Sequence, residues 1–488
     1  MKKTITILLA VLAVFILNSS FLIHNCICQW QPDVRLTNDP ASSNPCYNNG
    51  WCIGLSGNVV HVVWTDLRDG NYEIYYKRSS DEGTSWGADT RLTNNSGLSL
   101  DPKVAVSGEV VHIVWMDTRD GNYEIYYKRS TDGGLTWGAD TRLTNNTAYS
   151  YRVSISLSAS VVHIVWYDNR DGNYEIYYKN STDGGTTWGT DTRLTNAIFE
   201  SYYPSISASG SVVHVSWHDM RDGNREIYYK RSTDGGTSWG SDVRLTNDTA
   251  YSYYSSIGVS GSVVHIVWSD FRDSDYEIYY KRSTDGGSSW GSDTRLTNAL
   301  GESGYPSISV SGSFVHIVWH DLRDGNWEIY YKRSTDGGIS WSPDIRLTNE
   351  PAYQWGPSVT AYGSAVHVVW RDFRDGNDEI YYKRNPTGNI TGIENITSEI
   401  PKEFKLMQNY PNPFNPTTNV QFSIINVQFV ILKVFDILGR EVATLVKEQL
   451  KPGTYEVSFD GSMLNSGVYF YRLLTPDFSE TKRMLMIK

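Results

Sequence analysis

Residues 111–146 read VHIVWMDTRDGNYEIYYKRSTDGGLTWGADTRLTNN, and variants of this stretch recur along most of the chain. The tryptophan of its Val-His-x-x-Trp motif occurs at positions 64, 115, 166, 217, 268, 319 and 370, always 51 residues apart. A fixed period of this length indicates a repeat architecture in which each copy is one supersecondary unit packed on its neighbours. Most of the 488 residues therefore belong to one sevenfold repeat rather than to three unrelated domains.

Each copy contains four segments that are predicted to be strands. In the third copy they are residues 153–158, 161–166, 174–179 and 191–195. An Asp-Gly-Asn turn joins the second segment to the third, as in a tight hairpin, and helical periodicity is absent. Four-stranded units at this spacing predict an all-β fold, a seven-bladed β-propeller over residues 29–385.

The two ends of the repeat region predict how the ring closes. The seventh copy stops after Lys383 and Arg384 and has no fourth strand. Residues 33–38, DVRLTN, stand alone near the N-terminus and match the missing strand. We therefore expect this segment to form the outer strand of the last blade and to cover an edge that would otherwise be open.

A second motif, Ser-x-Asp-x-Gly-x-x-Trp, follows the third predicted strand in six copies. Its aspartates are Asp81, Asp132, Asp183, Asp234, Asp285 and Asp336, and its tryptophans are Trp86, Trp137, Trp188, Trp239, Trp290 and Trp341. The aspartate can accept backbone N–H bonds within a turn, and the tryptophan can pack beneath it. These turns resemble the Asp-box (BNR) repeats of the sialidase superfamily. The resemblance implies a structural role, because in that family the turns lie on the face opposite the active site.

The first residues are predicted to be a signal peptide, residues 1–28. Lys2 and Lys3 precede an apolar run over residues 7–17, which at 11 residues is too short to span a bilayer. Two of the four cysteines fall at the cleavage site, so Cys46 and Cys52 remain. In an oxidising compartment this pair predicts a local disulfide rather than a metal site. No transmembrane span is expected after the signal is removed.

The C-terminal part has a different composition. Residues 386–403 are predicted to be a linker, because they are rich in Pro, Gly, Asn and Thr. Residues 404–488 contain YPNPFNPTT at 410–418, FDILGREV at 435–442 and SGVYFYRL at 466–473. This stretch resembles the type IX secretion sorting domain, a small β-sandwich recognised by an outer-membrane translocon. It lacks the proline-bearing turn usual between the first two strands, here residues 424–430, where a hairpin is expected. The resemblance implies export through the periplasm to the cell surface or exterior, with the type IX machinery as a partner.

Charge excludes one class of partner. With 43 Lys and Arg against 54 Asp and Glu, the net charge is -11, which argues against a nucleic-acid partner.

The Asp-x-Arg-Asp-Gly-Asn turns carry oxygen ligands that suit Ca²⁺, but the arginine opposes a dense cation site. We therefore expect a structural Asp/Arg network, no metal and no cofactor. The histidine of each Val-His-x-x-Trp motif is predicted to pack between blades rather than to act in catalysis.

The positions that differ between copies predict the ligand site. In a blade of this topology the turns between the second and third strands share a face with the links between blades, and we call it the ligand face. Variable, ring-rich positions on it are Tyr151, Tyr167, Tyr203, His218, Tyr254, Tyr305, His320, Trp355 and Arg371. Aromatic rings beside polar groups suit a sugar. An alternative of equal weight is that these rings fill the central channel.

These features predict a secreted or cell-surface protein that binds a glycan or polysaccharide, as a lectin does. One alternative is an exo-glycosidase of sialidase type, and another is a protein-binding scaffold or adhesin. The resemblance to sialidases would require three arginines, a Tyr/Glu pair and an acidic Asp. The Arg-Ile-Pro motif that carries the first arginine is absent, and most Arg, Glu and Tyr residues occupy positions repeated in every copy. Sialidases are also typically six-bladed, so we predict no catalytic residue.

Overall fold

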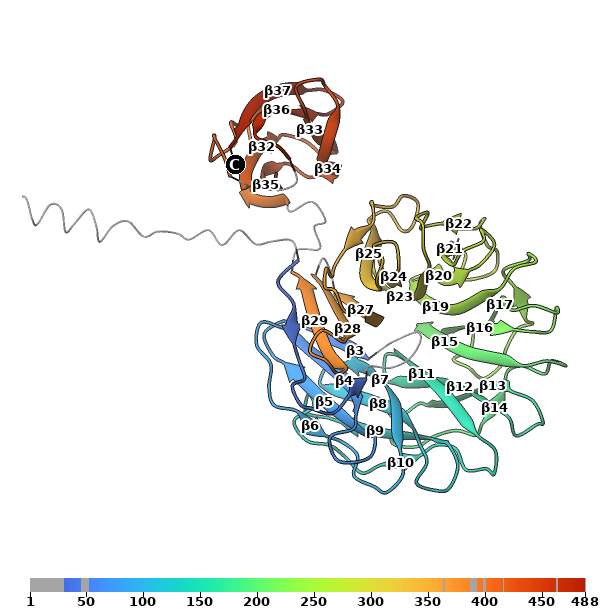
Figure 1. Ribbon diagram of the computed structural model, residues 1–488. Helices are drawn as coiled ribbons and strands as arrows, with labels where there is room; N and C mark the ends of the chain where they lie inside the picture. The colour runs from blue at the N-terminus through green and yellow to red at the C-terminus, as the bar shows by residue number, and fades with distance from the viewer. Residues whose placement is uncertain are drawn as a thin grey trace, which may run out of the picture. The chain divides into compact units, whose positions relative to one another are not determined.

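The third repeat shows how one unit of sequence becomes one sheet (Figure 1). Its strands are β11 (Ser150–Ser158), β12 (Val161–Asp168), β13 (Glu175–Ser181) and β14 (Thr192–Arg193), and each pairs antiparallel with the next. The four predicted strands are confirmed in number and order. β11 begins three residues earlier than predicted, because its register with β12 shifts between Tyr151 and Ser154 and then resumes.

The computed structural model describes residues 30–44, 52–362, 365–386, 393–397, 401–415, 417–461 and 464–487. It divides the chain into two compact units, one formed by Trp30–Gly388 and one that contains Asn389–Lys488. The predicted signal peptide and Cys46 lie outside the described residues. Cys52 is buried, and its pairing with Cys46 stays a prediction. Within the described ranges no helix could span a bilayer.

Seven sheets are formed by the described residues of the unit Trp30–Gly388, one for each sequence repeat, and we call them blades 1 to 7. The innermost strands are β3 (Ile53–Ser56), β7 (Ser99–Ser107), β11, β15 (Ser201–Ser209), β19 (Ser252–Ser260), β23 (Ser303–Ser311) and β27 (Gln354–Tyr362). Consecutive innermost strands contact each other, and β27 contacts β3, so the ring closes.

The other strands follow outward in each blade. The second strands are β4 (Val59–Asp66), β8 (Val110–Asp117), β12, β16 (Val212–Asp219), β20 (Val263–Asp270), β24 (Phe314–Asp321) and β28 (Ala365–Asp372). The third strands are β5 (Glu73–Ser79), β9 (Glu124–Ser130), β13, β17 (Glu226–Ser232), β21 (Glu277–Ser283), β25 (Glu328–Ser334) and β29 (Glu379–Asn385). The outer strands are β1 (Val34–Arg35), β6 (Thr90–Arg91), β10 (Thr141–Arg142), β14, β18 (Val243–Arg244), β22 (Thr294–Arg295) and β26 (Ile345–Arg346), and β2 (Ser43–Asn44) also pairs with β4.

The N-terminal segment closes the ring as predicted. Strand β1 pairs with β29 through Val34 opposite Tyr382 and Arg35 opposite Tyr381. Trp30 adds a contact that the sequence reading missed, because its ring packs edge-on against Tyr331 at 5.0 Å. Trp30 therefore replaces the tryptophan of the Asp-box turn that blade 7 lacks. The sequence contained evidence for this contact, because Trp30 precedes DVRLT at the same spacing at which Trp188 precedes DTRLT.

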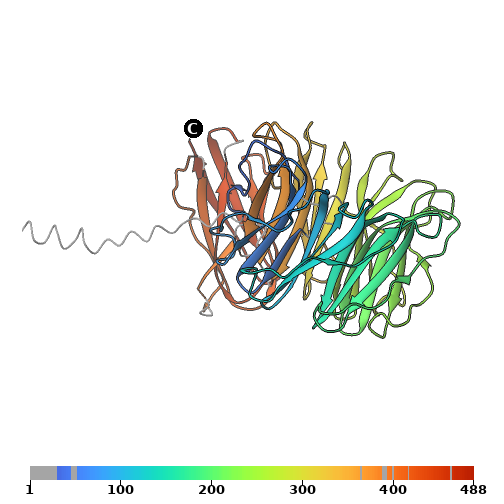
Figure 2. The same ribbon diagram turned by 90° about the horizontal axis from the view of Figure 1, so that it is seen from below.

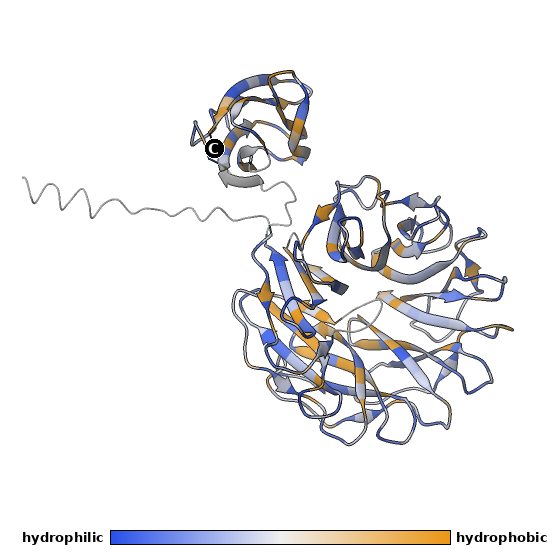
Figure 3. Ribbon diagram, in the orientation of Figure 1, coloured by the Kyte–Doolittle hydropathy of each residue, from blue (hydrophilic) through white to orange (hydrophobic). Residues whose placement is uncertain are grey.

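Apolar side chains fill the spaces between neighbouring blades. In Figure 3 hydrophobic residues follow the strands of the ring, while its loops are mostly hydrophilic. The tryptophan of each Val-His-x-x-Trp motif has no exposed surface. Its indole N–H donates to the aspartate two residues later, as Trp115 does to Asp117 at 2.8 Å. The side view shows that the turns gather on two opposite faces of the ring (Figure 2).

The Asp-box turns join neighbouring blades. The backbone N–H and hydroxyl of Thr136 donate to the Asp132 carboxylate, and these bonds hold the pKa of Asp132 well below its usual range. Trp137 packs edge-on against Tyr76 of the preceding blade at 4.9 Å, and the Tyr76 hydroxyl lies 2.7 Å from His61 Nδ1. The repeated histidines are therefore structural, as predicted. Their Nδ1–hydroxyl pairs are His61–Tyr76, His112–Tyr127, His163–Tyr178, His214–Tyr229, His265–Tyr280, His316–Tyr331 and His367–Tyr382.

Two adjacent glycines of one Asp-box turn allow a matched test of this packing. Both have positive φ, but a Cβ on Gly134 would lie 2.0 Å from the Tyr76 hydroxyl, whereas a Cβ on Gly133 would meet nothing within 4 Å. We expect Gly133→Ala to lower the free energy of unfolding by about 1 kcal/mol and Gly134→Ala by about 3 kcal/mol or more. Chemical denaturation of both variants measures the difference. Equal losses would contradict this account of the turn.

The second unit is the predicted β-sandwich. One sheet has the order β30 (Ile393–Thr397), β35 (Gly453–Asp460), β32 (Thr417–Ile424) and β31 (Lys405–Leu406). The other has the order β34 (Glu441–Leu450), β33 (Gln428–Phe435), β36 (Gly467–Leu474) and β37 (Ser479–Met486). Apolar side chains from both sheets form one core.

Two details of this unit differ from the sequence prediction. Residues 393–397, predicted to be linker, form β30 and pair with β35. The segment contains β-branched residues and lies along the edge of a sheet, and composition alone does not show that such an edge is available for pairing. The expected hairpin between β32 and β33 is also wrong. These strands belong to different sheets, so the segment between them crosses from one sheet to the other and needs no tight turn.

Candidate functional site

A backbone bulge recurs near the start of the innermost strands, toward the ligand face. In β11 it lies where the register with β12 shifts, and its central residue, Arg152, has φ of 52°. The equivalent residues also lie in the left-handed region, with φ values of 56° at Asp101, 50° at Tyr203, 52° at Tyr254, 52° at Tyr305 and 55° at Gly356. This conformation costs a residue other than glycine roughly 1–2 kcal/mol. Such strain gathers at functional sites, so the bulges are candidates for binding.

The side chains of the bulge residues contact one another around the ring. We call Asp101, Arg152, Tyr203, Tyr254 and Tyr305 the collar. Arg152 pairs with Asp101 at 3.3 Å and its guanidinium carbon lies 5.7 Å from the centre of the Tyr203 ring. The Tyr203 and Tyr254 rings meet edge to face at 5.2 Å, and Tyr254 stacks on Tyr305 at 4.4 Å. The collar is therefore charged on one side and aromatic on the other.

A cavity of about 490 Å³ lies on the aromatic side of the collar. Its size is within the range of small-molecule sites. Seven of the nine predicted ligand residues line it, namely Tyr167, Tyr203, His218, Tyr254, Tyr305, His320 and Trp355. The structure thus brings together residues from blades 3 to 7 that are up to 188 positions apart in the chain, the separation of Tyr167 and Trp355.

Two predicted residues are not among those that line the cavity. Tyr151 packs on Tyr167, with ring centres 5.7 Å apart, and burial raises the pKa of Tyr151 to about 12. Arg371 forms two bonds of 2.5 Å and 2.6 Å to Asp378, the residue immediately before strand β29. Tyr151 therefore supports a ring that lines the cavity, while the Arg371 guanidinium is paired within its own blade.

Two small residues open the cavity. Gly304 lies opposite His320, at a position where other blades carry Tyr151, Tyr202, Tyr253 or Trp355. Ser269 occupies a position where neighbouring blades carry His218 and His320. The hydroxyl oxygen of Ser269 accepts the backbone N–H of Tyr305 at 3.2 Å. Each of these residues is the small member of a cross-strand pair, and the two lie in adjacent blades 5 and 6. We call the space beside Ser269 and Gly304 the gap.

The sequence reading missed the residues that create this space. It selected large rings and therefore passed over Ser269 and Gly304, which break the aromatic pattern at their repeat positions. Other lining residues outside the predicted set are Tyr202, Arg225, Tyr253, Tyr276, Glu302 and Trp327; of these, Tyr202 and Tyr253 belong to the ring-rich links between blades that the sequence analysis singled out. The available signal was the departure of Ser269, Gly304, Arg225 and Trp327 from their equivalents 51 positions away.

The cavity carries few charges. His218 and His320 are buried, and burial lowers the pKa of each to about 3, so both are neutral near pH 7. The Nδ1 atom of each ring is buried without a hydrogen-bond partner among the described residues. Arg225 donates to the Tyr253 hydroxyl at 3.0 Å. Burial and nearby Asp275 raise the pKa of Glu302.

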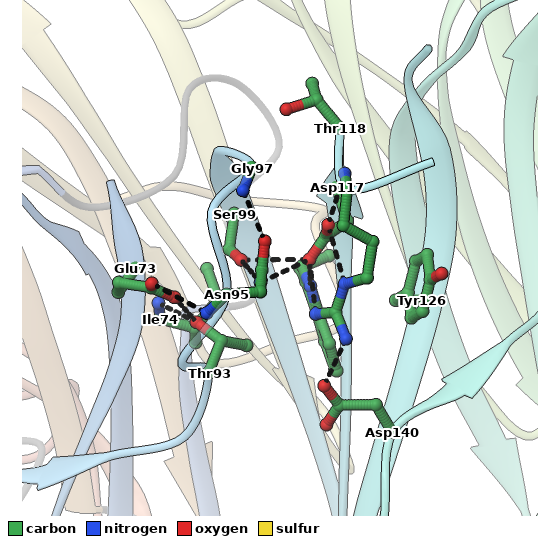
Figure 4. A network of polar contacts seen from close by, with 12 residues as sticks. Glu73, Ile74, Thr93, Asn95, Gly97, Ser99, Asp117, Thr118, Tyr126 and Asp140 are labelled. Carbon is green, nitrogen blue, oxygen red and sulfur yellow. Dashed lines mark hydrogen bonds and ion pairs between the residues drawn. The ribbon is translucent and has the colours of Figure 1, made fainter. Parts of the chain in front are cut away.

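The polar turns between the second and third strands recur around the ring and form a paired network, which Figure 4 shows for blades 1 and 2. Arg119 donates two bonds to Asp117, at 2.8 Å and 2.6 Å, and a third to Asp140 at 2.7 Å. The Asn95 side chain accepts the Gly97 N–H at 2.7 Å, which holds the link to the next blade in place. Carboxylates of these turns are thus bonded to arginine, as expected from the sequence. No group of three His, Cys, Asp or Glu side chains that could hold a metal occurs within the described ranges.

Comparison with solved structures identifies similar folds. The polysaccharide lyase Uly1 is similar over 74% of this chain and 100% of its own, with a TM-score of 0.53 and 9% identity. The sialidase of Trypanosoma rangeli is similar over 82% of this chain and 86% of its own, with a TM-score of 0.43 and 11% identity.

A curated relative is the xyloglucanase Xgh74A of Acetivibrio thermocellus, which is 25% identical over 244 residues. The match covers 44% of this chain and 28% of the relative, so the chain spans only about a quarter of the xyloglucanase it matches.

Two family models match the sequence. The model described as a secretion system C-terminal sorting domain matches residues 408–488, so the protein is exported by type IX secretion to the cell surface or exterior. The model described as a BNR repeat-like domain matches residues 13–266 and 114–317, which together are more than half of the chain. The protein therefore belongs to the BNR repeat-like domain family.

Proposed function

We propose that this exported protein is a carbohydrate-binding propeller and that its ligand occupies the cavity on the ligand face. The observation that carries the proposal is the lining of the cavity, where tyrosine, tryptophan and neutral histidine rings surround a small number of polar groups. Sugars present apolar C–H faces and hydroxyl groups, which match rings and single hydrogen-bonding groups respectively.

The backbone strain supports the same conclusion. Tyr203, Tyr254 and Tyr305 each keep a left-handed conformation that glycine would adopt more easily, as Gly356 does at the equivalent place in blade 7. A chain that needed only to close its central channel would not require tyrosine at these strained positions. Binding provides a reason for the side chains to be there.

The alternative of a glycosidase is less well supported by the lining. A carboxylate pair is the usual requirement, and sialidases use a tyrosine nucleophile with arginines for the substrate carboxylate. Among the described lining residues Glu302 is the one carboxylate and Arg225 the one arginine. The similarity to a xyloglucanase is consistent with a polysaccharide ligand and leaves hydrolysis to be tested.

Glycan-array binding of the full chain tests the proposal directly. We expect binding to a subset of glycans, including plant or algal polysaccharides, without release of products. Absence of binding to any glycan on such an array would contradict the proposed function. Release of sugar from a bound glycan or from a fluorogenic sialoside, abolished by substitutions in the cavity, would favour the enzyme. Capture of a protein partner unaffected by free sugar would favour the scaffold.

Replacing Tyr254 with glycine separates binding from folding. Tyr254→Gly removes a ring from the cavity and relieves the left-handed strain, so we expect at least about a tenfold loss of glycan affinity with little loss of stability. Titration calorimetry and thermal unfolding measure the two effects. Tyr362→Ala is the matched control, because that tyrosine is 68% exposed and lies at the other end of its innermost strand. Unchanged affinity of Tyr254→Gly would place the ligand elsewhere.

A further inference from the structure

The cavity is part of a longer row of rings. We call the following residues, in order, the aromatic band: Tyr149, Tyr151, Tyr167, Tyr203, Tyr254, Tyr305, His320, Trp327 and Trp355. Each ring contacts the next, with centres between 4.4 Å and 5.8 Å apart. The band therefore crosses from blade 3 to blade 7 without interruption.

Both ends of the aromatic band are exposed, while the rings between them are half-buried or buried. Tyr149 is 44% exposed at one end and Trp355 is 38% exposed at the other. Tyr167 and His320, between them, are less than 9% exposed and line the cavity. A site for a terminal sugar would have one open end and a closed one. A band that reaches solvent at both ends suits a chain that enters on one side and leaves on the other.

The charges around the cavity point to an uncharged ligand. Recognition of carboxylate or sulfate groups uses arginine or lysine that is free to donate to them. Here the described lining holds a single arginine, Arg225, whose Nη1 donates to the Tyr253 hydroxyl and whose guanidinium carbon lies 4.9 Å from the centre of that ring. Its buried Nε has no partner among the described residues, so this arginine offers a ligand one N–H rather than the paired donors that a carboxylate takes from several cations. The one lining carboxylate, Glu302, lies near Asp275, whose charge would repel an acidic sugar. Both lining histidines are neutral, so they add no positive charge.

The gap between Ser269 and Gly304 gives the band a single recess. The Ser269 oxygen accepts the Tyr305 N–H, so its hydroxyl hydrogen can donate to a ligand. A Cβ added to Gly304 would lie 3.1 Å from His320 Nε2, which places the edge of that imidazole beside the recess. A hydroxyl donor and an imidazole nitrogen at one recess suit the hydroxyl groups of one sugar unit.

We propose that the aromatic band binds an internal stretch of an uncharged polysaccharide, with one sugar unit seated in the gap between Ser269 and Gly304. This inference rests on the proposed function and adds the class of ligand, the direction in which it lies and the position of its most deeply bound unit. It differs from recognition of a terminal acidic sugar, which a sialidase-like site would require.

The test compares neutral and acidic polymers on the full chain. We expect xyloglucan to bind, polygalacturonate to bind at least about tenfold more weakly, and xyloglucan oligosaccharides to gain affinity as they lengthen. Tighter binding of polygalacturonate would overturn the uncharged class and leave carbohydrate binding intact. Equal affinity for a monosaccharide and a long oligosaccharide would overturn the internal mode. Failure of every glycan to bind would remove the proposed function and this inference together.

Filling the gap tests its role. Gly304→Tyr places in blade 6 the residue that blades 3, 4 and 5 carry at this position, so the fold is expected to accept it. We expect it to reduce xyloglucan binding by about 100-fold, because the ring would occupy the recess. Leu100→Tyr introduces the same residue at the equivalent position of blade 2, outside the cavity lining, and is expected to bind normally. Normal binding by folded Gly304→Tyr would overturn the placement of the sugar in the gap.

Discussion

Deleting residues 30–38 from the full chain is expected to abolish the cooperative unfolding of the ring, or to lower its stability by more than about 5 kcal/mol. The deletion removes Trp30 from its contact with Tyr331 and leaves β29 with an open edge. It also removes Arg35, which pairs at 2.7 Å with Glu379, a carboxylate with no exposed surface. An unpaired buried charge and a lost buried aromatic ring each cost several kcal/mol.

A pair of point variants separates closure from the loss of one ion pair. Arg35→Ala and Arg142→Ala remove equivalent bonds to Glu379 and Glu124, but only Arg35 joins the two ends of the chain. We expect a larger loss of unfolding free energy, and a less cooperative transition, for Arg35→Ala. Urea denaturation followed by tryptophan fluorescence and by circular dichroism measures both. Identical behaviour of the two variants would show that the N-terminal strand is not what holds the ring closed.

Stability is expected to fall steeply as the pH drops below 6.5. Nine histidines in the described ranges are buried, and burial lowers their pKa from 6.5 to about 4 for His61, His112, His163, His214 and His265, and to about 3 for His218, His316, His320 and His367. The unfolded chain takes up protons at these sites below pH 6.5, whereas the folded ring does not. Their contribution is therefore complete above pH 6.5 and is lost as the pH falls toward 4.

The expected size of this effect is large because the residues act together. At pH 5.5 each histidine costs about 1.4 kcal/mol, so nine cost an amount of the order of the whole stability of a typical domain. Thermal unfolding of the ring between pH 8 and pH 4.5 measures the change. A control is the dependence on salt at fixed pH, which should be weak because the cause is burial. A melting temperature that stayed constant down to pH 5 would contradict the buried, neutral histidines.

Much of the fold could be predicted from the sequence because it is periodic. The Val-His-x-x-Trp and Asp-box motifs mark the same strand and turn in each copy, so one repeat sets the strand order of all. The closing strand was visible as an unpaired copy of DVRLT at residues 33–37. Strand β30 escaped the same reasoning, because pairing with a distant edge strand leaves no mark in local composition.

The candidate site was predicted in part. Large rings at variable positions identified most of the aromatic lining, including His218 and Trp355. The charge state of the histidines could not be predicted, because burial lowers their pKa and burial depends on the packing of neighbouring blades. The pairing of Arg371 with Asp378 could not be predicted either, because it depends on where the hairpin between β28 and β29 places the two side chains.

The sequence by itself determined the repeat, the order of strands in a blade, the address for export and the face that varies between copies. These depend on local pattern, which one copy shares with the next. Only the tertiary structure decided where the variable residues form a cavity. Two small residues, Ser269 and Gly304, open it, and their size matters only because the packing of blade 6 against blade 5 places them beside each other, in a cavity lined by rings from other blades.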